Sequence, residues 1–116
     1  LERWFGKTPT GALQDAATSC RDWLTSVDTT GYAQAYKVFA YHDGPTRVEL
    51  DSMQRPVLFM TGADDPNSTP EMSIAMAKRT PIGSVQIIDG AAHMAPVTHP
   101  TDIAAAIIPH VQKGAA

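Results

Sequence analysis

The chain has 116 residues, of which 43% are hydrophobic and 18% charged, and its formal net charge is −3. This composition is typical of a globular unit with its own core, and it excludes a coiled coil and a disordered tail. The slightly acidic balance leaves no basic surface for nucleic acid, and no apolar run is long enough to cross a bilayer. We therefore expect a small-molecule substrate, with neither nucleic acid nor membrane as a partner.

The single cysteine, Cys20, excludes an internal disulfide and fits a reducing compartment, so we expect a cytoplasmic location. The chain opens at Leu1 rather than Met and shows no signal-peptide pattern. We expect it to have been cut from something longer, and the alternative is that only a short leader was omitted.

Periodic apolar residues predict two helices in the first half of the chain. Steps of three and four residues over 13–27 predict an amphipathic helix with Thr10 as its N-cap. Thr29 and Thr30 offer a cap for a second helix, which we expect to end around the breaker 43–45.

The second predicted helix carries an aromatic stripe formed by Tyr32, Tyr36 and Phe39. Such a stripe is either part of a packed core or the face of a lid over a substrate. The two helices together define the first expected unit, a helical lid or cap segment over residues 1–52.

The apolar pattern changes near Ser52, where short continuous runs replace the helical period. The predicted elements are a strand over 57–60, a helix with a capping box at 68–71, a strand over 85–88, and a helix opened by Pro100 and Asp102. We expect Pro109 to kink or end the last helix. This order predicts an α/β unit over 53–116, a parallel sheet with flanking helices whose strands are buried on both faces.

Two polar loops that follow the predicted strands carry the chemistry. The first loop delivers Asp65 and the second delivers His93. Because adjacent parallel strands lie about 5 Å apart, loops at one edge can bring a carboxylate and an imidazole into hydrogen-bond reach. The pair is a candidate orienter and general base. Asp64 is the other candidate for the acid. Its alternative role is that of a solvated or turn-forming carboxylate in the loop.

A nucleophile is missing from this pattern. The nearest candidates, none of them in a G-x-S-x-G turn, are Ser19, Cys20, Ser68 and Ser84. We expect Cys20 to behave as a small buried hydrophobic residue on its helix.

The remaining candidates predict no further site. The other histidines, His42, His99 and His110, adjoin turns or helix ends, where surface or capping roles are expected. A metal site built from Asp64, Asp65 and His93 would lack a second His or Cys at ligand spacing. We therefore expect no metal and no cofactor.

The segments 56–70 and 83–100 resemble the C-terminal half of an α/β-hydrolase-fold enzyme. Residues 1–43 resemble the lid of the group that includes 3-oxoadipate enol-lactonases, related esterases and non-haem chloroperoxidases. The resemblance implies that Asp65, in a G-x-x-D string, is the acid and that His93, in a G-x-x-H string, is the base. It also implies that the nucleophilic Ser lies upstream of Leu1.

This resemblance implies hydrolysis of an ester or lactone through an acyl-enzyme, with the upstream half of the fold as a required partner. The isolated chain would be inactive, and the open strand edge would favour a homo-oligomer. Tyr32, Tyr36 and Phe39 would roof the pocket, and Met94 would line it. The alternatives are perhydrolysis or carbon–carbon bond hydrolysis with the same triad, and a non-catalytic fragment or binding module with the same fold.

Overall fold

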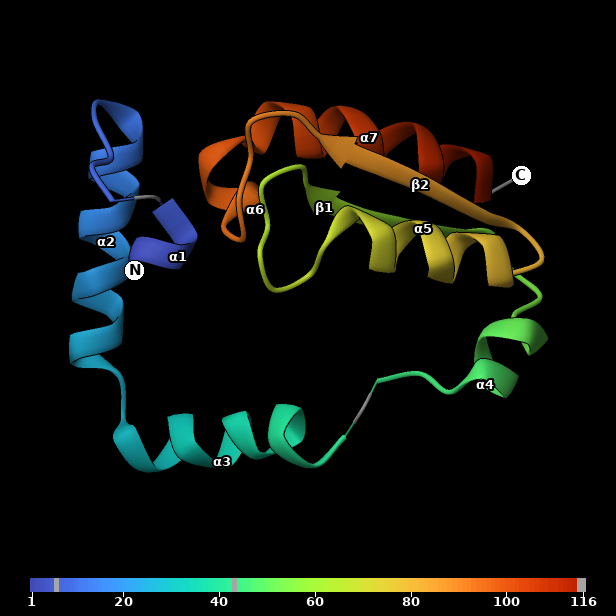
Figure 1. Cartoon of the computed structure of the whole chain (residues 1–116), viewed down its shortest axis with the longest axis horizontal. Coiled ribbons are helices and arrows are strands. Elements are labelled where there is room, and N and C mark those ends of the chain that lie inside the picture. The colour runs from blue at the N-terminus through green and yellow to red at the C-terminus, as the bar shows by residue number, and fades with distance from the viewer. Residues whose placement is uncertain (6, 43, 115–116) are drawn as a thin grey trace.

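Helices make up the first half of the chain, and strands alternate with helices in the second half (Figure 1). The computed structural model describes residues 1–5, 7–42 and 44–114. Its elements are α1 (Glu2–Phe5), α2 (Ala12–Ser26), α3 (Thr29–Tyr41), α4 (Arg47–Ser52), β1 (Val57–Gly62), α5 (Pro70–Arg79), β2 (Gly83–Ile88), α6 (Ala95–Thr98) and α7 (Pro100–Gly114). No helix in the described ranges is both long enough and apolar enough to cross a membrane.

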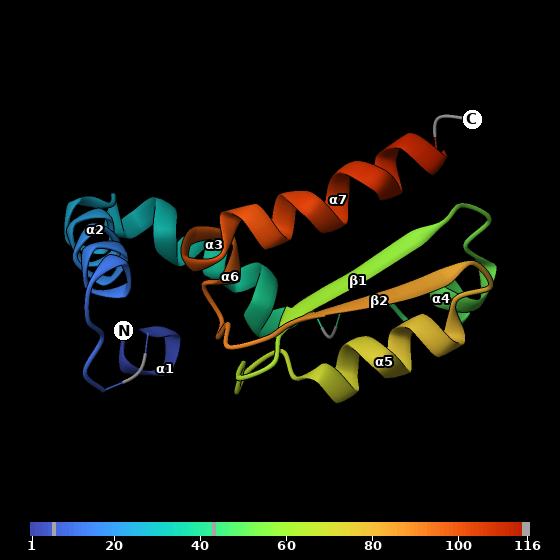
Figure 2. The same ribbon diagram turned by 90° about the horizontal axis from the view of Figure 1, so that it is seen from above.

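The predicted parallel sheet is confirmed. β1 and β2 pair in parallel, with a register that runs from Val57 opposite Gly83 to Gly62 opposite Ile88. Helices α5 and α7 lie on opposite faces of this sheet (Figure 2). The chain is thus a mixed α/β structure with a two-stranded parallel sheet and flanking helices, compatible with part of an α/β-hydrolase fold.

The expectation that both strands are buried on both faces is wrong. In β1 only Thr61 and Gly62 are buried, and in β2 only Ile88 is buried. Each strand pairs on one side alone in the described part of the chain, and its buried residues lie at its carboxyl end, where the two following loops meet.

Two of the predicted N-cap residues are wrong, since another residue stands at the N-cap of each helix. Gly11, at φ 56°, precedes α2 in place of Thr10, since glycine adopts this left-handed conformation without a steric penalty. Asp28 caps α3 in place of Thr29 or Thr30, because its carboxylate accepts from the backbone N–H of Gly31 at 2.6 Å.

The capping box expected at 68–71 is also absent, because the N-cap of α5 is Thr69, which makes no side-chain cap bond. A capping box does form at α4, where Thr46 and Glu49 satisfy each other's backbone N–H groups. The six-residue α4 is too short to show a helical period, so the sequence did not predict it.

The predicted helix ends have different outcomes. The helix α3 ends at Tyr41, just before the expected breaker, of which Asp43 lies outside the described residues. The last helix does not end at Pro109, since α7 contains this residue and continues to Gly114. A kink at Pro109 stays a prediction.

Two small apolar clusters hold the described chain together. The first, which we call the helical cluster, consists of buried Phe5, Ala17 and Cys20, with Met94 packed against it. The second consists of Ile88, Ala91 and Ala95, with Met60 and Ile103 packed against it. The expected burial of Cys20 is confirmed.

The aromatic stripe of α3 belongs to neither cluster, and the core-packing interpretation is wrong in the described structure. Tyr32, Tyr36 and Phe39 are 43%, 58% and 79% exposed. The two tyrosine rings stack on each other with their centroids 6.1 Å apart. In Figure 1, α3 stands apart from the sheet, and none of its described residues is buried. The division of the chain at residue 52 stays a prediction.

A close backbone approach fixes the carboxyl ends of the two strands. The N–H of Ala63 donates to the carbonyl of Ile88, and the N–H of Asp64 donates to the carbonyl of Ala91, both at 2.9 Å. A Cβ atom on Gly62 would overlap the backbone of Ala91 and Ala92. Glycine is therefore required at residue 62 for the two loops to meet.

We predict that Gly62→Ala lowers the free energy of unfolding by about 1–3 kcal/mol, because the added methyl group forces the two loops apart. Urea denaturation measures this loss. Gly114→Ala is the matched control, since a Cβ there meets nothing within 4 Å, and it should leave stability unchanged or slightly raised. Equal stability of the two variants would contradict the close approach.

Candidate active site

The loop after β1 holds Asp65 in a closed turn. One carboxylate oxygen, Oδ1, accepts from the backbone N–H groups of Asn67 at 2.8 Å and Ser68 at 3.0 Å. The hydroxyl of Thr61, on β1, donates to the carbonyl of Ser68 and lies 3.5 Å from the other carboxylate oxygen, Oδ2. Asp65 is buried, so these contacts replace the water that its carboxylate would otherwise bind.

The loop after β2 brings His93 to the same carboxylate. Gly90, at φ 67°, turns the chain after the strand. The Nδ1 atom of His93 lies 2.9 Å from Oδ2 of Asp65. Because a carboxylate only accepts hydrogen bonds, Nδ1 donates and carries the proton, which leaves Nε2 as an acceptor.

The two side chains differ in their access to solvent. The side chain of Asp65 is 5% exposed and that of His93 is 35% exposed. No described residue hydrogen-bonds to Nε2 of His93. Nε2 of His93 is therefore accessible from solvent, while Nδ1 is hydrogen-bonded to Asp65.

Hydrogen bonding keeps Asp65 ionised. Burial opposes the charge of the carboxylate, but the N–H groups of Ser68 and Asn67 and the ring of His93 outweigh it. They hold the pKa of Asp65 below its ordinary value of 3.8. The group is thus an anionic acceptor at neutral pH.

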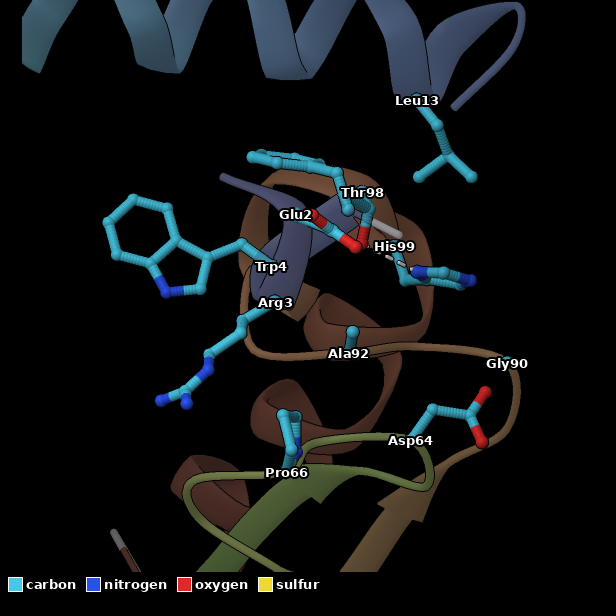
Figure 3. Close-up of a pocket in the computed structure, with 11 residues that line it drawn as sticks. Glu2, Arg3, Trp4, Leu13, Asp64, Pro66, Gly90, Ala92, Thr98 and His99 are labelled. Atoms are coloured by element: carbon cyan, nitrogen blue, oxygen red, sulfur yellow. Dashed lines mark hydrogen bonds between the residues drawn. The ribbon is translucent and has the colours of Figure 1, made fainter. Parts of the chain in front are cut away.

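Asp64, the rival acid, does not contact His93. It is exposed, and its backbone N–H helps to join the two loops by donating to the carbonyl of Ala91. Its side chain projects into a neighbouring cavity (Figure 3). The structure therefore brings Asp65, and not Asp64, to the imidazole.

Two cavities lie beside these loops. A cavity of about 210 Å³ adjoins the Asp65–His93 pair and is lined by Met60, Thr61, Gly62, Asp65, Ser68, His93, Ala95, Pro96 and Ile103. A cavity of about 390 Å³ lies between α1 and the two loops (Figure 3) and is lined by Glu2, Arg3, Trp4, Phe5, Leu13, Asp64, Pro66, Gly90, Ala92, Thr98 and His99.

The predicted pocket residues line neither of these two cavities. Tyr32, Tyr36 and Phe39 lie on α3, and no residue of α3 is among those that line either cavity. Met94 follows His93 directly and packs against the helical cluster. A substrate-facing role for these four residues stays a prediction.

The other histidines make no comparable pair. His42 is exposed at the end of α3, and His110 is half-buried on α7. Nδ1 of His99 lies 2.8 Å from the hydroxyl of Thr98, and both residues line the larger cavity. Within the described residues, no three His, Cys, Asp or Glu side chains cluster as a metal site would require.

Two residues of the site escaped prediction from the sequence. Thr61 directly follows the apolar residues 57–60 within β1. A single threonine at the end of an apolar strand does not by itself indicate a contact with a catalytic residue. Trp4 lies at the opposite end of the chain, yet its ring centroid is 6.1 Å from that of His93, with the planes inclined at 33°. No local pattern could have found this contact.

Comparison with known proteins points to hydrolases. No protein-family model matches the chain. It is 37% identical over 108 residues to a curated protein of Acinetobacter baylyi, the (E)-2-((N-methylformamido)methylene)succinate hydrolase. The alignment covers 89% of this chain and 38% of that protein, so the chain spans well under half the length of its relative.

We predict that the ionised Asp65 stabilises the fold above about pH 4, and that this contribution is lost as the pH falls through the lowered pKa of the folded state. Unfolding by urea, measured between pH 7 and pH 3, should show a smaller acid-induced loss for Asp65→Asn than for the parent. Asp64→Asn is the control and should lose stability in parallel with the parent, since its carboxylate is exposed. The same acid dependence in all three proteins would refute this prediction.

Proposed function

We propose that this chain supplies the acid and the base of a serine-type α/β hydrolase that cleaves an ester or lactone through an acyl-enzyme. The observation that carries the proposal is the Asp65–His93 hydrogen bond of 2.9 Å, made between loops that follow two adjacent parallel strands. Similarity to a curated hydrolase supports hydrolysis in general. In this proposal the chain forms the C-terminal part of the fold.

The proposed mechanism uses the two side chains in distinct roles. A serine hydroxyl is a poor nucleophile until a neutral imidazole takes its proton, and Nε2 of His93 is the atom available for this transfer. Asp65 keeps the proton on Nδ1 and stabilises the imidazolium that results. His93 then passes the proton to the leaving group and activates the water that releases the acyl group.

The nucleophile comes from outside this chain in the proposed enzyme. The relative is much longer than the aligned region, so a complete protein of that length has room for the nucleophile and for an oxyanion hole. The upstream half of the fold is therefore the proposed partner, and the chain alone is proposed to be inactive.

The name of the relative favours a second substrate class. That protein is a hydrolase of a succinate that carries an N-methylformamido group. Hydrolysis of an amide bond in a small carboxylic acid uses the same proton transfers as ester hydrolysis. Ester, lactone and N-formyl substrates compared on one enzyme preparation discriminate between the two classes.

We predict that the chain alone hydrolyses aryl esters no faster than buffer, because it has no activated nucleophile with which to form an acyl-enzyme. Activity should appear when the upstream half is supplied in excess. Hydrolysis is followed by release of the coloured alcohol. Labelling of this chain alone by a serine-directed fluorophosphonate would contradict the prediction, because it would show that one of its own serines is activated.

We predict that His93→Ala abolishes turnover in the assembled enzyme while the fold is retained, because proton transfer is lost. Asp65→Asn should reduce kcat by about 10⁴-fold, since asparagine can position the imidazole but favours the wrong tautomer. Asp64→Asn should leave kcat within about a few-fold of the parent, because Asp64 makes no contact with His93.

Steady-state kinetics and circular dichroism on the same preparations measure both effects. Loss of turnover in Asp64→Asn but not in Asp65→Asn would identify Asp64 as the acid of the triad. Full activity of both variants would remove the hydrolase interpretation of this loop.

A further inference from the structure

Among the described residues, Trp4 forms the one aromatic ring pair that involves His93. The two ring centroids are 6.1 Å apart, and the planes are inclined at 33°. This separation lies within the range of about 4.5–7 Å over which aromatic rings interact favourably. Trp4 is half-buried, so its ring is held rather than free in solvent.

The position of Trp4 is fixed by the helical cluster. Its neighbour Phe5 is buried with Ala17 and Cys20, and Trp4 itself packs against this cluster. Met94, which follows His93 directly, packs against the same cluster. The indole and the imidazole are therefore attached to one apolar anchor, which keeps α1 next to the loop after β2.

The charged groups around this ring pair are few. Asp65 binds Nδ1 of His93 from the loop after β1. Glu2 and Arg3 precede Trp4 on α1, are exposed, and carry opposite charges. Asp64 and His99 line the cavity next to α1, which Trp4 also lines, and neither lines the Asp65–His93 cavity. Figure 3 shows Trp4 and Arg3 projecting to one side of α1, away from Leu13 and His99.

An indole ring favours the charged form of an imidazole that lies over its face. The face of the ring system is negative, and it attracts a cation placed over it within about 6 Å of the ring centroid. In the proposed mechanism, His93 becomes an imidazolium each time the nucleophile loses its proton. Trp4 therefore contacts the base at the step in which positive charge develops on it.

We infer that Trp4 is a positioning residue for His93, whose indole keeps the imidazole turned toward Asp65 and stabilises its protonated form during the reaction. This inference rests on the proposed function. It assigns α1, and not the aromatic stripe of α3, as the element that covers the base.

The test compares Trp4→Leu with Trp4→Phe in the assembled enzyme. Leucine keeps the apolar cover but has no π face, so the NMR titration midpoint of the His93 Cε1–H should fall by about half a pH unit. The acidic limb of the kcat/KM profile should move to lower pH by the same amount. Phenylalanine should restore most of both shifts. Trp23→Leu is the control, since Trp23 is 59% exposed on α2, and it should titrate as the parent does.

An unchanged titration of His93 in Trp4→Leu, or equal shifts in the leucine and phenylalanine variants, would overturn the inference. If Trp4→Leu does not fold, a fluorinated tryptophan at residue 4 in a Trp23→Phe background keeps the shape of the indole and weakens its negative face. The midpoint should then fall as fluorine is added, and a constant midpoint would overturn the inference equally. Retained activity in His93→Ala would reject the proposed function. The NMR titration of His93 needs no turnover, so it would still test whether Trp4 stabilises the protonated imidazole.

Discussion

The candidate site depends on the backbone contact that joins the carboxyl ends of β1 and β2. Parallel pairing brings the two strands together, but it is the hydrogen bonds from Ala63 and Asp64 that draw the following loops into contact. This approach is possible because Gly62 has no side chain. The distance between Asp65 and His93 is therefore set by backbone geometry rather than by the flexible ends of two side chains.

The two members of the pair are held to different degrees, and this difference suits their proposed roles. Asp65 is buried and receives hydrogen bonds from two backbone N–H groups in addition to the imidazole. A buried carboxylate without such partners would favour its neutral form, which could not orient the imidazole in the same way. His93 is held at Nδ1 alone, and its exposed edge leaves Nε2 accessible to a group that approaches from outside.

The sequence predicted the features that local chemistry determines. Continuous apolar runs that end in glycine located both strands and the loops that carry Asp65 and His93. The helix starts were less predictable, because several residues near each start can cap, and Gly11 and Asp28 prevailed over nearby threonines. The contact of Trp4 with His93 joins the N-terminal helix to the loop after β2, and no local pattern encodes it. The exposure of α3 was not predictable for a similar reason. A periodic stripe shows that one face of a helix is apolar, but it does not show which part of the molecule covers that face.

The packing of the described residues also bears on the proposed partner. No large side chain in the described ranges is completely buried, while Tyr36, Phe39 and many other large hydrophobic side chains are exposed. Because burial of apolar surface is the main favourable term in folding, such a chain has little stabilisation of its own. A segment that covered the open edge of β1 would add to that stabilisation, and the nucleophile-bearing half is proposed to do so. Binding of that half would then stabilise the fold of this chain by mass action and complete the triad in the same step. Stability and activity should consequently depend on the concentration of the partner in the same way.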